Sequence, residues 1–338
     1  MSVVDFSEYS NNAGAGAAAE SPAKTRVGIV VDASCDLPDA FFERGDIAVL
    51  PISVRIGESV YVDQHNPNAT HRYLREQNGG RGVEAETTAL TSAEMQALFL
   101  ERFALDYDSV YCLTTASTRS KTYELAMEAS AQTLNAARAM RQAADIKRPF
   151  QFRVIDSKNL FAGHGVPVLA LLDMIDAGFS AKDIRDGLFK IIDATYGYLV
   201  VDDLKYMRAR ARARGDRSVG FMAATFGSAL DIKPIVRGRL GATTPVAKFR
   251  GRTEAWSKLL RFAAGQVQRG LLTPHVVVSY GGSLSDVQNA AGFAELSSAC
   301  TNENVTLHLT PMTISGMVNM GTQALCIGFA ADEHSPDF

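Results

Sequence analysis

Hydroxyl-bearing side chains gather at two places in the sequence. Between residues 114 and 120, five of the seven residues are Ser or Thr, among them Ser117 and Ser120. Thr87 and Thr88 belong to a second such run at 86–92. Each run precedes a predicted helix, where free hydroxyls and the first backbone amides can bind an anion. Ser and Thr at these positions are also typical helix N-caps, so the residues alone leave both interpretations open.

Aspartates follow several of the apolar runs. Asp32 comes directly after residues 27–31 and is followed by Ser34, while Asp63 and Asp156 come after similar runs. Ligands of open α/β sheets bind beyond the carboxyl ends of the strands. Aspartates there can orient backbone amides or hold a metal ion. A second candidate function is therefore a metal-dependent hydrolase or transferase acting on a small phosphorylated or acylated substrate.

The sequence contains none of the short catalytic motifs that we sought. A G-x-S-x-G turn, an H-E-x-x-H pair and a G-x-x-x-x-G-K-[ST] loop are all absent. The cysteines are far apart and form no C-x-x-C pair, which predicts free structural thiols in a reducing compartment; they are Cys35, Cys112, Cys300 and Cys326. We expect no catalytic residue, no cofactor, no bound metal and a cytoplasmic location.

The net charge of −3 gives no overall attraction to nucleic acid or to an anionic membrane. The local exception is a basic run from Lys205 to Arg217, which supports a third candidate function, the binding of an acidic partner. No aromatic residues alternate with its arginines, so nucleic-acid binding is not expected. No apolar stretch approaches the ~20 residues of a membrane helix, and residues 1–20 do not resemble a signal peptide.

Apolar periodicity predicts strands alternating with helices in the first half of the chain. We expect strands at 27–31, 47–54, 109–113 and 152–155, and helices from Ser92, over 121–142 and over 167–177. Farther along, helices are expected at 181–193 and 203–214 and strands at 275–280, 305–309 and 324–329. The predicted fold is α/β with a flexible tail (1–23), a parallel-sheet α/β domain (24–178) and an α+β domain (179–338), with the ligand site at their interface.

Several short motifs, in this order and spacing, make the sequence similar to the DegV family of fatty-acid-binding proteins. Residues 32–38 (DASCDLP) resemble the family's D-S-x-S-D-L-P turn, and residues 87–91 (TTALT) stand in the place of T-S-Q-P-S. Residues 117–123 match S-x-x-S-G-T-Y except that Lys121 replaces Gly. Residues 155–157 (IDS) and 232–235 (IKPI) also fit, so the resemblance runs from about Arg26 to Phe329.

The resemblance implies a long-chain fatty acid bound between the two domains. Its carboxylate would be held by hydroxyls of Thr87 and Ser117, with Thr88 and Ser120, near Asp32 and Ser34, and its acyl chain would lie in an apolar tunnel. The resemblance also implies presentation of the bound acid to a separate fatty-acid kinase, with Arg250 near the exposed carboxylate. Asn319 stands where the family has the His of H-x-G-P-G.

Overall fold

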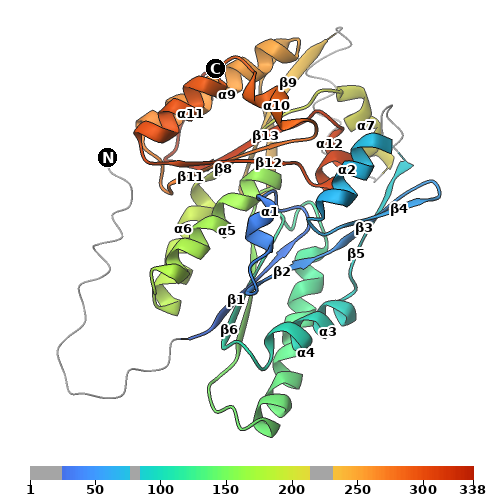
Figure 1. Cartoon of the computed structure of the whole chain (residues 1–338), viewed down its shortest axis with the longest axis vertical. Helices are drawn as coiled ribbons and strands as arrows, with labels where there is room; N and C mark the ends of the chain where they lie inside the picture. Colours follow the sequence, from blue (N-terminus) through green and yellow to red (C-terminus); the bar gives the residue numbers. More distant parts are fainter. Residues whose placement is uncertain (1–24, 77–83, 214–230) are drawn as a thin grey trace, which may run out of the picture.

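The computed structural model describes residues 25–76, 84–213 and 231–338. Two sheets and the helices packed on them dominate these residues, and a small three-stranded sheet lies beside the first (Figure 1). This arrangement confirms the expected α/β class, with a parallel sheet and a separate mixed sheet. The predicted boundary near residue 178 stays a prediction.

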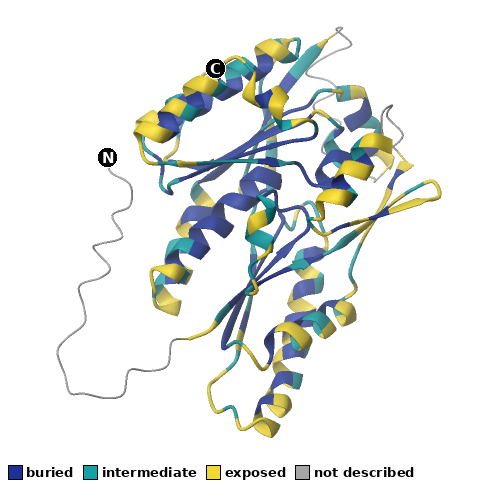
Figure 2. Ribbon diagram, in the orientation of Figure 1, coloured by how far each residue is buried: buried dark blue, intermediate teal, exposed yellow. Residues whose placement is uncertain are grey.

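The first sheet is wholly parallel, with the strand order β2-β1-β6-β7. Its strands are β1 (Val27–Asp32), β2 (Ile47–Leu50), β6 (Ser109–Thr114) and β7 (Gln151–Asp156). The central strand β6 is buried along its whole length (Figure 2), as expected for a strand covered on both faces. Helices α3 (Ser92–Phe103) and α4 (Thr122–Ala143) cover one face through a core that includes Val30, Val110 and Phe99.

The second sheet is mixed and has the order β10-β9-β8-β13-β11-β12, with only β11 and β12 parallel. Its strands are β8 (Thr195–Val200), β9 (Ile232–Arg239), β10 (Ala242–Arg250), β11 (His275–Tyr280), β12 (Thr306–Pro311) and β13 (Leu325–Ala330). Helices α9 (Arg252–Arg269) and α11 (Phe293–Asn302) pack together over its outer face, and α10 (Leu284–Gln288) lies beside them (Figure 1).

The expected strand at 47–54 is wrong in one respect: it is two strands in two different sheets. After β2, the chain enters β3 (Ile52–Ile56), the middle strand of an antiparallel sheet with β4 (Ser59–Asp63) and β5 (Glu86–Ala89). Pro51 separates β2 from β3. Because proline has no backbone N–H to donate to a ladder, it marks the point where the chain leaves the parallel sheet. Helix α2 (Pro67–Glu76) follows β4, and the short α1 (Asp39–Phe42) precedes β2.

Helix α5 (Phe161–Asp176) is buried between the first and second sheets. It packs against β8, β11 and β13, while the same core contains Ile29 and Leu113 of the parallel sheet. The helix begins six residues before the expected 167, with Pro167 inside it. This early start requires very close packing: a Cβ added at Gly328 would lie 2.4 Å from the carbonyl oxygen of Ala162. Helix α6 (Ala181–Ala194) packs beside α5.

Two shorter helices complete the second half. Helix α7 (Leu204–Ala213) contacts α12 (Ile314–Met320), which also touches β3 and β4. Most other expected elements lie within a few residues of their predictions, but the sequence analysis missed β4, β5, β8, β9 and β10 as strands. The N-cap of α3 is Thr91: the Thr91 hydroxyl accepts the Glu94 amide, and the Glu94 carboxylate accepts the Thr91 amide.

The four cysteines are buried free thiols, as expected. In the ranges given above, no helix is sufficiently long and apolar to span a membrane.

Candidate functional site

Polar side chains collect at the carboxyl edge of the parallel sheet, beginning with Asp32 at the end of β1. Asp32 is fully buried, and its Oδ1 accepts hydrogen bonds from the Ser34 amide (3.0 Å) and hydroxyl (2.5 Å). Its Oδ2 accepts the amide of Thr115 at 2.5 Å, from the loop after β6. Asp32 therefore connects the turn after β1 to the hydroxyl-rich loop after β6 by accepting hydrogen bonds from both.

Ser117, in the same loop, contacts the third strand end. Its hydroxyl donates to Oδ2 of Asp156 at 2.5 Å, and Oδ1 of Asp156 accepts the amide of Lys158 at 2.7 Å. Ser117 and Asp156 are both half-buried. The ends of β1, β6 and β7 thus share one stretch of chain, residues 115–117, through two aspartates.

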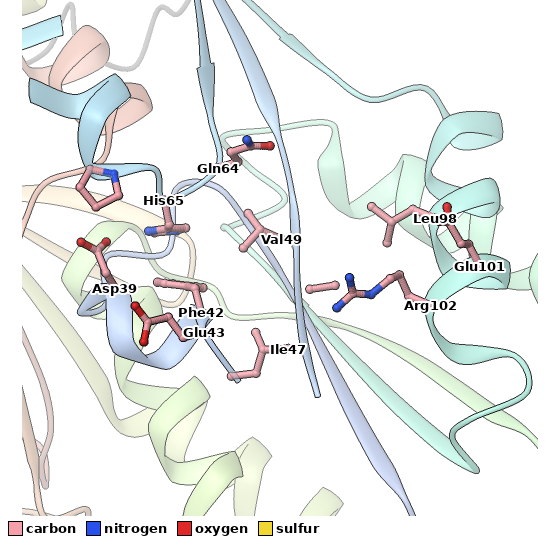
Figure 3. Close-up of a pocket in the computed structure, with 12 residues that line it drawn as sticks. Asp39, Phe42, Glu43, Ile47, Val49, Gln64, His65, Leu98, Glu101 and Arg102 are labelled. Carbon is pink, nitrogen blue, oxygen red and sulfur yellow. The ribbon is translucent and has the colours of Figure 1, made fainter. Parts of the chain in front are cut away.

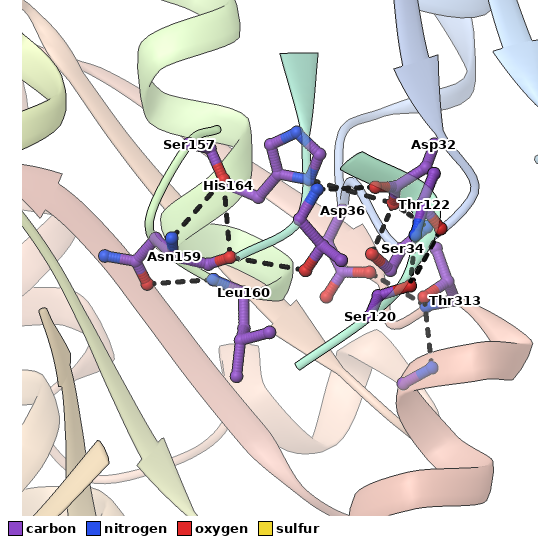
Figure 4. A network of polar contacts seen from close by, with 12 residues as sticks. Asp32, Ser34, Asp36, Ser120, Thr122, Ser157, Asn159, Leu160, His164 and Thr313 are labelled. Carbon is purple, nitrogen blue, oxygen red and sulfur yellow. Dashed lines mark hydrogen bonds and ion pairs between the residues drawn. The ribbon is translucent and has the colours of Figure 1, made fainter. Parts of the chain in front are cut away.

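The Ser120 hydroxyl is placed as a helix cap and not as a group that is available to a ligand. Its hydroxyl oxygen accepts the Thr122 amide at 3.2 Å and lies 2.7 Å from the Thr122 hydroxyl (Figure 4). The residue at the boundary of α4 itself, Lys121, makes no side-chain cap. This geometry favours the N-cap alternative for Ser120, while Ser117 faces Asp156.

The hydroxyl-rich loop also contacts the second sheet. The Thr118 hydroxyl donates to the Gly241 carbonyl at 2.6 Å, and Arg119 Nη2 donates to the Thr243 hydroxyl at 2.6 Å. Nearby, Asn159 Nδ2 donates to the carbonyls of Thr195 and Gly238. The loop from 115 to 120 therefore lies at the junction of the two halves of the chain.

His164 is a buried titratable residue that the sequence analysis did not select. Its Nδ1 lies 3.9 Å from Oδ1 of Asp32, and burial lowers the pKa of His164 below its usual value. The residue stands between Gly163 and Gly165 in the first turns of α5. A histidine between two glycines just before the helix predicted at 167–177 was the signal available, but its nearness to Asp32 depends on packing between distant segments.

Thr87 and Thr88 occupy a different setting. Both lie on β5, where they pair with Val54 and Ser53 of β3, and both are exposed. Because successive side chains of a strand point to opposite faces, only one of the two can face a given ligand. The first part of this hydroxyl-rich run is thus a strand at the edge of the small sheet.

Two further aspartates hold the start of α12. Oδ1 of Asp36 accepts the Thr313 amide at 3.0 Å and its Oδ2 accepts the Ser279 hydroxyl at 2.5 Å. Oδ2 of Asp63 accepts the Ser315 amide at 2.6 Å. Burial raises the pKa of Asp36 to about 7 and that of Asp63 to about 6. These contacts connect residues more than 240 positions apart in the sequence.

The remaining predicted site residues lie on the second half of the chain. Arg250 is exposed at the end of β10, where it pairs with Ile232 of β9. Asn319 is half-buried on α12 and donates to the Ser315 carbonyl at 2.8 Å. Asp32, Ser34 and Ser117 therefore share one hydrogen-bonded region, whereas Thr87, Thr88, Arg250 and Asn319 lie on other elements.

The aspartates proposed for a metal are occupied with protein donors. Asp32, Asp63 and Asp156 each accept at least one backbone amide. Among residues 25–76, 84–213 and 231–338, no group of three His, Cys, Asp or Glu side chains is arranged to hold a metal ion.

The basic run also differs from a simple exposed patch. Arg210, on α7, is buried and donates to the carbonyl of Ala85, just before β5. Its guanidinium thus anchors the segment that carries Thr87. Arg212 is exposed, and Arg214 and Arg217 lie outside the described residues.

A surface depression of about 510 Å³ lies beside the edge strand β2 (Figure 3). Its lining comes from α1, β2, α3 and the segment after β4, and includes Phe42, Val49, His65 and Leu98. His65 stacks on Phe42 with ring centroids 3.6 Å apart. None of the predicted site residues lines this depression.

Comparison with known proteins identifies the class. A family model described as "Uncharacterised protein, DegV family" matches residues 26–332. The chain belongs to the DegV family. A DegV domain-containing protein of Xanthomonas axonopodis pv. citri is 46% identical over 310 residues, which cover 92% of this chain and 99% of that protein.

Solved structures share the fold. A stearic acid-binding protein from Eubacterium ventriosum superposes with a TM-score of 0.69 at 20% identity, covering 90% of this chain and 98% of that one. The Fatty Acid Kinase (Fak) B3 protein of Streptococcus pneumoniae, loaded with linoleic acid, gives a TM-score of 0.66 at 14% identity and covers 91% and 100%. The likeness extends over both halves of the chain.

Proposed function

We propose that this protein binds a long-chain fatty acid and holds its carboxyl group with Ser and Thr hydroxyls at the carboxyl edge of the parallel sheet. The observation that carries the proposal is the full-length likeness to DegV-family structures described as binding stearic acid or loaded with linoleic acid. Fold alone does not define function. Further support is the hydroxyl-rich loop at the junction of the two sheets, since Ser and Thr hydroxyls can hydrogen-bond a carboxyl group.

Ser117 is the leading contact within this proposal. It is half-buried, lies in the loop after the buried strand β6, and stands in the matching position of the family's S-x-x-S-G-T-Y motif. Thr87 is the second contact, since Arg210 fixes the start of its strand through Ala85. Ser120, Asp32 and Ser34 complete the proposed surroundings of the head group, and Thr88, on the opposite face of β5, is the alternative to Thr87.

The first experiment is mass spectrometry of an organic extract of the natively purified chain. A saturated or monounsaturated fatty acid at near-stoichiometric amount is expected. Added oleate should also raise the melting temperature of delipidated protein, because ligand at 100 times its dissociation constant stabilises by about 2.7 kcal/mol. An extract without fatty acid, together with an unchanged melting temperature, would refute the proposal.

We infer further that the bound acid is presented to a separate fatty-acid kinase rather than altered by this chain. Support comes from the likeness to the Fatty Acid Kinase (Fak) B3 protein and from Arg250, which is exposed at the end of β10. Asn319 replaces the family's His, so coupling to a kinase should respond to Asn319→His. A phosphorylation assay with a purified fatty-acid kinase tests this, with Arg250→Ala expected to lower turnover while fatty-acid affinity is kept. Equal turnover for wild type and Arg250→Ala would argue against this role.

A further inference from the structure

The hydroxyl hydrogen of Ser117 is already committed to a partner within the chain. The Ser117 hydroxyl donates to Oδ2 of Asp156 at 2.5 Å, and Oδ1 of the same carboxylate accepts the Lys158 amide at 2.7 Å. A hydroxyl has one hydrogen and two lone pairs. When Asp156 is ionised, Ser117 can only accept a hydrogen bond from any third partner.

This arrangement conflicts with an ionised ligand. A fatty-acid carboxylate is also an acceptor only, so an ionised acid and an ionised Asp156 would leave no hydrogen between the ligand and Ser117. The two like charges would also repel each other across the serine. Either the ligand or Asp156 must then carry a proton for the contact to form.

We propose that binding of a fatty acid takes up one proton, which Asp156, Ser117 and the ligand carboxyl group share. This inference rests on the proposed function and assigns Asp156 as a positioning residue that acts through Ser117. In one form the ligand donates its O–H to Ser117. In the other, protonated Asp156 donates to Ser117, and Ser117 donates to the ligand carboxylate. Both forms contain the same added proton.

The charged groups around Asp156 have their own partners. The Lys158 ammonium lies 2.7 Å from Oδ1 of Asp193 on α6. From the loop before α4, Arg119 donates to Thr243 at 2.6 Å. These contacts direct both cations toward other elements.

On α5, His164 is fully buried, and burial lowers its pKa, which favours the neutral ring. Asp32, on β1, is the second carboxylate of the region and lies 3.9 Å from His164 Nδ1. Within residues 25–76, 84–213 and 231–338, the surroundings therefore favour a proton, rather than a cation from the chain, as the partner of a ligand carboxylate.

Asp156→Asn gives a test with a specific direction. The Lys158 amide still needs an acceptor, so the Asn carbonyl oxygen should stay beside Lys158 and the amide nitrogen should face Ser117. The Asn N–H would donate to Ser117, whose hydrogen becomes free for an ionised ligand. Asp156→Asn should thus bind the anion without taking up a proton.

The experiment is calorimetric titration of dodecanoate, at a concentration where it is monomeric, into wild type, Asp156→Asn and the control Asp145→Asn, which removes an exposed carboxylate after the C-terminal end of α4. Titrations at pH 7 in two buffers with different ionisation enthalpies measure proton uptake. We expect close to one proton per ligand for wild type and Asp145→Asn, and close to zero for Asp156→Asn. Between pH 7 and pH 9 wild-type affinity should fall by up to about tenfold per pH unit, and that of Asp156→Asn should stay constant. Dodecanol, which has a hydrogen to donate but no titrating group near these pH values, should bind wild type independently of pH.

The possible outcomes separate this inference from the proposed function. Binding of dodecanoate to wild type without proton uptake would overturn this inference and leave fatty-acid binding intact. Failure of wild type to bind dodecanoate or oleate at any pH from 6 to 9 would overturn both. Should Asp156→Asn fail to fold, the buffer dependence and the dodecanol comparison on wild type alone decide the question.

Discussion

Two pairs of aspartates near strand ends differ in what they hold. Asp36 and Asp63 bind the first turn of α12 and Ser279, and so join the two halves of the chain. Asp32 and Asp156 instead hold residues 115–117, the loop with the proposed ligand hydroxyl. The same residue type at similar positions therefore clamps the two halves of the chain together in one pair (the clamp, Asp36 and Asp63) and holds the proposed binding loop in the other. What each aspartate holds depends on where its hydrogen-bond donor lies in the fold, and not on the local sequence around the aspartate.

The largest expected effect is on the clamp. Asp36→Ala leaves the Ser279 hydroxyl and the Thr313 amide buried without their acceptor, at a cost of about 3 kcal/mol or more in the free energy of unfolding. Asp36→Asn should keep most of the stability, because its carbonyl can still accept the Thr313 amide. Chemical denaturation at pH 6 measures both. If Asp36→Ala unfolds at the wild-type denaturant concentration, the clamp contributes no stability.

The next effect is a pH dependence of stability from Asp63. Burial raises its pKa from 3.8 to about 6, so the folded chain binds more protons than the unfolded chain between these values. The contribution is fully present below pH 4 and is lost as the pH rises through 6. Relative to Asp63→Asn, wild type should lose on the order of 2–3 kcal/mol of unfolding free energy between pH 4 and pH 7.

The control for this measurement is Asp145→Asn, which removes a carboxylate that is 88% exposed and 3.9 Å from Lys147. Its pH profile should follow that of wild type. Parallel profiles for wild type and Asp63→Asn would show that Asp63 titrates normally in the folded chain.

The binding loop should respond in affinity rather than in stability. Ser117→Ala removes one hydrogen bond to the ligand carboxyl group. A hydrogen bond to a charged group contributes ~1.5 kcal/mol, so oleate binding should weaken by about tenfold. The melting temperature without ligand should change little. Calorimetric titration is the assay, with the exposed Ser285→Ala as matched control. Unchanged affinity in Ser117→Ala would remove this loop from the head-group site.

The smallest effect distinguishes Thr87 from Thr88. Both are exposed on β5, where water competes for each hydroxyl, so Thr87→Val should weaken oleate binding by only about two- to fivefold. Thr88→Val should have no effect, because its side chain points to the opposite face of the strand. The reverse result would assign the contact to Thr88, and two neutral substitutions would place the head group away from β5.

Local patterns were sufficient to predict much of the first half of the fold. The β-branched run at β1 and the apolar periodicity of α3 and α4 define elements that are buried on a predictable face. Pro51 indicates the break between β2 and β3, since a proline inside an apolar run argues against one continuous strand. Strands β9 and β10 were not predicted. Most of their residues are not fully buried, so their sequences show no clear alternation of apolar and polar residues.

The site was predictable in its residue types but not in its connections. Hydroxyls before α4 and aspartates at strand ends can be found in the sequence, but their pairing cannot. Ser117 and Asp156 are 39 residues apart, and Asp36 and Ser279 are 243 apart. Such contacts arise from the order of strands in the sheets and from how α5 brings the two halves together, which no local window contains.

A crystal structure of the chain with bound oleate tests the central claim most directly. The account predicts a carboxyl oxygen within about 3.2 Å of the Ser117 hydroxyl, with the acyl chain extending between the two halves. A head group located elsewhere, for example in the depression beside β2, or oleate absent at saturating concentration, would contradict it.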